Sequence, residues 1–91
     1  MVVNECKDHD DHKIGNARYF LAKNLKELRA TKGFSQEDLA LEAGLHRTFV
    51  SHLERGARNA SIDNIEKLAI ALGVSTYRLL VDPDVLRHSQ N

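Results

Sequence analysis

A short polar segment in the middle of the chain carries the side chains best suited to recognise a ligand. The helix expected from His46 or Arg47 to Glu54 has Val50 and Leu53, three residues apart, on one side. Its other side carries basic and small polar groups. Such groups on the outer face of a short helix are typical of contacts with base edges and phosphates in a DNA groove. The pattern therefore favours recognition of nucleic acid.

Three side chains of this segment are candidates for contacts with bases. Arg47 and Thr48 lie in its first turn, and His52 follows one turn after Thr48 on the same side. An arginine can bind a guanine with two hydrogen bonds, which is worth roughly 1–3 kcal/mol of discrimination. The alternative for all three is a solvated surface position without a ligand.

Six further side chains are candidates for contacts with phosphates: Gln36, His46, Ser51, Arg55, Arg58 and Asn59. Gln36 opens the preceding helix, whose N-terminal dipole favours a phosphate. Arg55, Arg58 and Asn59 follow the recognition segment, where the chain would leave the groove. The alternative for these last three is that they solvate a loop.

The elements that must position these side chains are all helices. Proline occurs once and glycine five times, and leucine and alanine recur every three or four residues. Serine caps are expected at Ser35, Ser61 and Ser75. The expected helices are Asn16–Thr31, Gln36–Ala43, His46 or Arg47–Glu54, Ile62–Leu72 and Thr76–Val81.

The second and third of these helices have the features of two short helices that cross at a steep angle. Ala40 supplies a small residue at the crossing, and Gly44 permits a tight turn with positive φ. Leu39, Val50 and Leu53 are expected to anchor both helices on the core.

The ordered set of these features resembles a known family. Leu39-Ala40, the Gly44 turn, Glu54-Arg55-Gly56 and Ala71-Leu72-Gly73-Val74 are similar to the helix-turn-helix domain of the Cro and phage-repressor type, the XRE family. The resemblance covers about two-thirds of the chain, from Phe20 to Val81. It implies a five-helix, lambda-repressor-like fold and a regulator that binds double-stranded DNA. It also implies a buried ion pair between Arg29 and Glu54.

A narrower resemblance is to the controller proteins of restriction–modification systems. It rests on Arg47-Thr48-Phe49-Val50-Ser51, on Glu54-Arg55 and on Arg58-Asn59, although phage and chromosomal regulators share much of this pattern. Controller proteins bind as dimers upstream of their own gene and the endonuclease gene. Within the pattern, Phe49 is expected to pack at the core edge, with a position against the sugar–phosphate backbone as the alternative.

Dimerisation on an inverted-repeat operator is expected, because one short recognition helix offers few base contacts and a second copy doubles them. The candidate interface residues are Tyr77, Leu80 and Val81, with Val85 and Leu86 as additions. The alternative is that these side chains close the core of the monomer.

Charge is unevenly distributed along a chain whose formal net charge is zero. Residues 13–58 hold nine basic and five acidic side chains, which places positive charge where DNA binding needs it. We expect a flexible acidic tail at 1–15, a DNA-binding domain at 16–82, and at 83–91 a tail or a short extra turn. The aspartates and histidines of residues 8–12 are expected to stay solvated rather than bind a metal, and Cys6 to be unreactive.

Several functional classes are disfavoured. No paired carboxylates, nucleophile with an adjacent base or phosphate-binding glycine loop indicates an enzyme, and no cofactor or small-molecule ligand is expected. No apolar segment is long enough for a membrane span, and no secretory signal is expected, so the expected location is the cytoplasm. The alternative function is an antitoxin-like or other protein-interaction module on the same fold.

Overall fold

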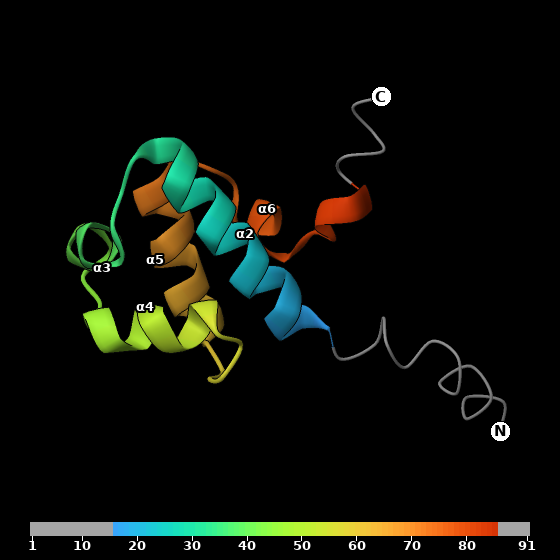
Figure 1. Ribbon diagram of the computed structural model, residues 1–91, viewed down its shortest axis with the longest axis horizontal. Coiled ribbons are helices and arrows are strands. Elements are labelled where there is room, and N and C mark those ends of the chain that lie inside the picture. The colour runs from blue at the N-terminus through green and yellow to red at the C-terminus, as the bar shows by residue number, and fades with distance from the viewer. Residues whose placement is uncertain (1–15, 86–91) are drawn as a thin grey trace, which may run out of the picture.

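Five helices, followed by a helical turn at 83–85, make up residues 16–85, the part of the chain that this computed structural model describes (Figure 1). They are α2 (Ala17–Lys32), α3 (Gln36–Ala43), α4 (Arg47–Glu54), α5 (Ile62–Leu72) and α6 (Thr76–Leu80). Residues 16–85 contain no strand. The expected all-helical class is therefore confirmed.

Local signals set both ends of α3. The Ser35 hydroxyl accepts a hydrogen bond from the Asp38 N–H at 3.0 Å, and the Asp38 carboxylate accepts one from the Ser35 N–H at 3.0 Å. This capping box satisfies backbone donors that a helix start leaves unpaired. Gly44, with φ of 72°, ends the helix in a left-handed conformation that glycine adopts without steric cost. The range predicted for this helix is confirmed.

Caps also define α4 and α5. The structure selects Arg47 as the start of α4, because His46 lies in an extended conformation and its Nδ1 accepts from the Thr48 N–H at 3.2 Å. Ser61 caps α5 by accepting from the Asn64 N–H at 3.1 Å. The predicted ranges of these two helices are confirmed as well.

Differences from the prediction occur at the two ends of the domain. Helix α2 begins and ends one residue later than expected, at Ala17 and Lys32. Helix α6 ends at Leu80, because Val81 is extended, with ψ of 149°. Ser75 occupies the N-cap position of α6 but makes no side-chain capping bond.

In the segment 83–91, for which a tail or a short extra turn was expected, residues 83–85 form a helical turn. The Asp82 carboxylate accepts from the Asp84 N–H at 2.9 Å, as an N-cap does. Proline suits the first position of a helix, where its missing N–H has no partner to lose.

One apolar core joins all five helices. Leu25, Leu39, Val50, Leu68 and Leu79 are completely buried, one from each helix. Burial of each such side chain contributes roughly 1.5–3 kcal/mol to folding. Phe20 and Leu28 of α2 are only half-buried, and Leu28 packs against the edge of this core.

The packing divides the domain into two ends. Helix α3 packs on α4 and α5, whereas α6 packs on α2 and α5 (Figure 1). Helix α2 also contacts α4, so it links the two ends. None of the helices in residues 16–85 combines the length and apolar character that a bilayer crossing requires.

Candidate nucleic-acid interface

Helix α4 has two faces of opposite character. Val50, Leu53 and Glu54 are buried against the rest of the domain, while Arg47 and Thr48 are exposed in its first turn. The two best candidates for base contacts therefore lie on the surface, at the end of α4 where the helix begins. That these two side chains contact bases remains a prediction.

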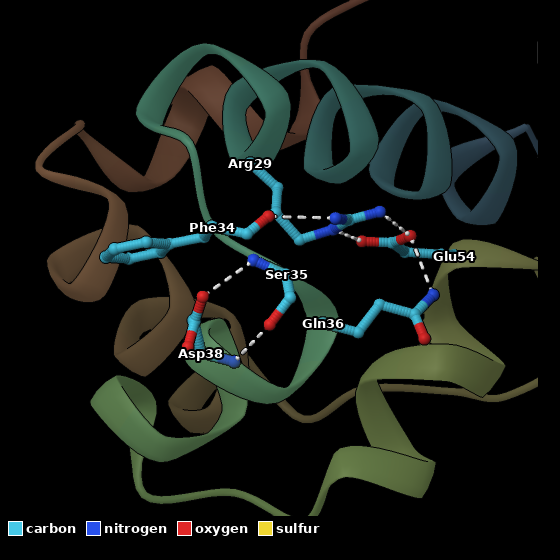
Figure 2. A network of polar contacts seen from close by, with 6 residues as sticks. All are labelled: Arg29, Phe34, Ser35, Gln36, Asp38 and Glu54. Atoms are coloured by element: carbon cyan, nitrogen blue, oxygen red, sulfur yellow. Dashed lines mark hydrogen bonds and ion pairs between the residues drawn. The ribbon is translucent and has the colours of Figure 1, made fainter.

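A buried carboxylate holds this helix in place. The side chain of Glu54 is 2% exposed, and Arg29 of α2 donates to both of its oxygens, from Nε to Oε2 at 2.6 Å and from Nη2 to Oε1 at 2.9 Å (Figure 2). Such a two-bond pair fixes both the distance and the plane of the two groups. The ion pair that the family resemblance implied is therefore present.

The same guanidinium also organises the turn before α3. Its Nη1 donates to the Phe34 carbonyl at 2.9 Å, so Arg29 joins α2, the Phe34–Ser35 segment and α4 (Figure 2). The hydrogen bond to Glu54 is the largest cause that raises the pKa of Arg29, with a further contribution from the carboxylate charge. The arginine therefore stays charged, and Glu54 stays paired.

Gln36 is attached to this network as well. Its Nε2 donates to Glu54 Oε1 at 3.0 Å, and its side chain is half-buried at the first position of α3 (Figure 2). The amide group predicted to contact a phosphate is thus held by the carboxylate that anchors α4. This contact fixes the start of α3 relative to the recognition segment.

The two histidines of the segment lie in different settings. His46 is exposed at the N-cap of α4, and its Nδ1 is used in capping. Because Nδ1 accepts there, the ring proton of the neutral side chain is on Nε2, which can donate to a phosphate. His52 is half-buried near the other end of the helix.

The other side chains predicted to contact phosphates make hydrogen bonds or ring contacts within the domain. Arg55 Nη1 donates to Ser51 Oγ at 3.1 Å, one turn earlier on the same side of α4. The Arg58 guanidinium lies 5.8 Å from the centre of the Phe49 ring, a cation–π arrangement. Phe49 itself is half-buried and packs against the core, as expected.

Asn59 makes a hydrogen bond that was not predicted from the sequence. Its Oδ1 accepts a hydrogen bond from Arg18 Nη2, in the first turn of α2. Arg18 also lines a groove between α2 and the end of α4, together with Lys23, Lys26 and Arg55. No motif indicated Arg18, because its partner is 41 residues away in the sequence.

A second residue that was not predicted, Asn24, is completely buried in α2. Its Nδ2 donates to the Leu79 carbonyl at 2.9 Å and to the Val81 carbonyl at 2.8 Å. These bonds satisfy carbonyls that the end of a helix leaves unpaired. Asn24 therefore closes the C-terminus of α6 and holds it against α2.

The candidate dimer residues differ in exposure. Tyr77 is 70% exposed on α6, whereas Leu80 and Val81 are half-buried and Leu80 packs against the core. Val85 is also exposed. Leu86, Cys6 and the aspartates and histidines of residues 8–12 lie outside the described residues.

Comparisons with known proteins give the family. The helix-turn-helix family model matches residues 25–79. The chain is 52% identical over 66 residues to a hypothetical transcription factor of Neisseria meningitidis, a match that spans 72% of this chain and 62% of the relative. It is 48% identical over 66 residues to control protein C.BamHI of Bacillus amyloliquefaciens, across 71% of this chain and 82% of the relative.

A solved structure supports the same assignment. The chain superposes on the biofilm regulator SinR, solved in complex with DNA, with a TM-score of 0.65 and 35% identity, covering 67% of this chain and 98% of that one. The lambda-repressor-like fold is thereby confirmed, as is the expectation of a protein that is not an enzyme, because the family consists of transcription factors. This chain belongs to the helix-turn-helix family of DNA-binding transcriptional regulators, XRE type, and is related to the restriction–modification controller proteins.

Proposed function

We propose that this protein binds double-stranded DNA as a homodimer, with α4 in the major groove, and regulates transcription from an inverted-repeat operator. The proposed targets are restriction–modification genes, since one of its relatives is a control protein and shares 48% of its residues over the matched length. The domain proposed to do this is residues 16–82, with the acidic residues 1–15 and the segment 83–91 outside it.

The two-faced character of α4 carries the proposal. Its inner face is anchored by Val50, Leu53 and Glu54, so the outer face can enter a groove without loss of core contacts. We assign base contacts to Arg47, Thr48 and His52. We assign phosphate contacts to side chains at the start of α3, on α4 and in the α4–α5 loop: Gln36, His46, Ser51, Arg55, Arg58 and Asn59.

Charge and network geometry support these assignments. Arg58 and Asn59 extend the polar surface beyond α4, and the Arg18–Asn59 bond ties that loop to α2. At the other end, Gln36 is tied to Glu54, so the phosphate contact at the start of α3 has a set position relative to α4. Preorganised contacts of this kind lower the ordering cost of binding.

The proposed dimer surface centres on Tyr77, with Leu80 and Val81 beside it on or next to α6. An aromatic side chain that is 70% exposed is a candidate anchor for an interface. Sedimentation of the wild type and of Tyr77→Glu tests this surface. A dimer for the wild type and a monomer for the variant are expected, whereas dimers of equal stability for both would contradict the assignment.

The decisive experiment is selection from random duplex DNA with the wild type, followed by binding measurements with Arg47→Ala. Enrichment of an inverted repeat is expected, and Arg47→Ala should weaken binding to that repeat by about tenfold more than binding to random duplex. Lys67→Ala, which removes an exposed charge from α5, is the matched control and should leave the preference intact. No enriched repeat, or equal binding by wild type and Arg47→Ala, would favour a protein-interaction module instead.

Salt dependence separates phosphate contacts from base contacts. Arg58→Ala removes one phosphate contact from each subunit of the proposed dimer, so it should weaken binding to every sequence alike and reduce the slope of log K against log salt by about two. A loss of preference at one base pair with an unchanged slope would reassign Arg58 to base recognition.

A further inference from the structure

The Nδ1 atom of His52 is buried and has no hydrogen-bond partner. Within residues 16–85 it is the one buried side-chain nitrogen or oxygen in this state. The residue as a whole is half-buried, and Nε2 is not among these buried, unpartnered atoms. No described side chain bonds to Nε2, so this nitrogen keeps contact with solvent. The imidazole therefore has an inner nitrogen that lacks a partner and an outer one that is open to a ligand.

This asymmetry selects one tautomer of the ring. A neutral imidazole carries one N–H and one nitrogen with a free lone pair. A buried N–H without an acceptor is rarer in folded proteins than an acceptor without a donor, and a lone pair needs no room for a hydrogen. The lone pair therefore occupies the buried Nδ1, and the N–H is on the outer Nε2.

The position of the ring determines what this donor can reach. His52 lies one turn after Thr48 on α4, away from the buried Val50 and Leu53. In a major groove, an N–H donor can bond to N7 of a purine, O6 of guanine or O4 of thymine. It cannot pair with the amino group of cytosine, which is itself a donor.

We propose that His52 determines specificity by presenting an Nε2–H donor to an acceptor on a base edge, and so selects against cytosine at its position in the operator. This inference rests on the proposed function, because it assigns chemistry to a residue of the same surface. Arg47 would present a guanidinium to its acceptor, whereas His52 would present the single N–H of a ring whose other nitrogen is buried.

His46 provides a contrast within the same helix. Its Nδ1 is also an acceptor, but it is occupied by the Thr48 N–H at the N-cap. Substitution of His46 therefore alters the helix start, whereas substitution of His52 changes no hydrogen bond made by its side chain in the described residues. His52 is thus the position where an outer donor can be exchanged with little effect on the fold.

Two nearly isosteric substitutions test the proposal. In His52→Gln the amide nitrogen can take the place of Nε2, and in His52→Asn it can take only the place of Nδ1. With duplexes that vary at one base pair of the selected site, wild type and His52→Gln should keep the same preference. His52→Asn should lose about tenfold of that preference. Thermal unfolding establishes that both variants fold.

The tautomer itself is measurable without DNA. Long-range ¹H–¹⁵N correlation spectra of the ring should show the proton of His52 on Nε2, and a proton on Nδ1 would overturn the inference. An enriched repeat on which His52→Asn keeps the wild-type preference would overturn it as well, while leaving the proposed function standing. The absence of any enriched repeat would overturn both.

Discussion

The two short helices at opposite ends of the domain are held in different ways. Helix α3 has a capping box at its start, a glycine at its end, and a link through Gln36 to a charged network. Helix α6 has no side-chain cap, and its end is closed from outside by a neutral amide, Asn24. The end of the domain that holds α3 thus combines local caps with a charged network, whereas at the proposed dimer end the C-terminus of α6 is closed by two hydrogen bonds from one distant residue.

The largest expected effect concerns the charged network. Arg29→Met leaves the buried Glu54 carboxylate without its main partner and should lower the free energy of unfolding by about 3 kcal/mol. Urea denaturation measures this loss. Lys26→Met, an exposed substitution on the same helix, is the matched control and should change stability by less than about 0.5 kcal/mol.

A double variant sharpens that prediction. Arg29→Met combined with Glu54→Leu removes both charges and should recover part of the stability lost in the single variant, since no uncompensated buried charge remains. A double variant less stable than Arg29→Met would mean that Glu54 makes a further favourable contact.

The second effect tests the neutral contact. Asn24→Leu keeps a side chain of similar volume but leaves the Leu79 and Val81 carbonyls without their donor, and should cost about 2 kcal/mol. Hydrogen exchange should accelerate more in α6 than in α3. Equal acceleration in both helices would indicate that Asn24 supports the whole core rather than α6.

A third effect compares the serine caps directly. Ser35→Ala should cost about 1 kcal/mol, because Ser35 caps α3 through its hydroxyl. Ser75→Ala should cost less than half of that amount, about 0.5 kcal/mol or below, since no capping bond is lost. Chemical denaturation of the two variants measures the difference, and equal losses would contradict the contrast between the helices.

The smallest effect is a dependence of α3 on pH. The hydrogen bond from the Ser35 N–H is the main reason that the pKa of Asp38 lies below its usual 3.8. A lowered pKa in the folded state stabilises the fold above the usual value, and this contribution is lost as the pH falls through the folded value. Thermal unfolding from neutral to acidic pH should show a stability difference between wild type and Asp38→Asn that shrinks below about pH 4.

The parts of the fold that follow from neighbouring residues could be predicted from the sequence. The bounds of α3 and α5 were correct because serine caps and terminal glycines act within a few residues. The Arg29–Glu54 pair was expected only through the family resemblance. Asn24 was missed because its partners are 55 and 57 residues away, and no periodicity signals a polar residue placed in an apolar stripe. The link from Gln36 to Glu54 escaped notice for the same reason.

Helix α4 has an anchored face and an open face, so selection for stability and selection for DNA sequence act on different residues of the same helix in the proposed function. Changes at Val50, Leu53 or Glu54 alter the stability of the domain. On the proposed function, changes at Arg47 or Thr48, which are exposed, alter the recognised sequence at little cost in folding. If these side chains contact bases as proposed, new operators can be acquired by exchange of a few outer side chains on a constant framework. The same property makes the domain a suitable scaffold for redesigned DNA-binding specificity.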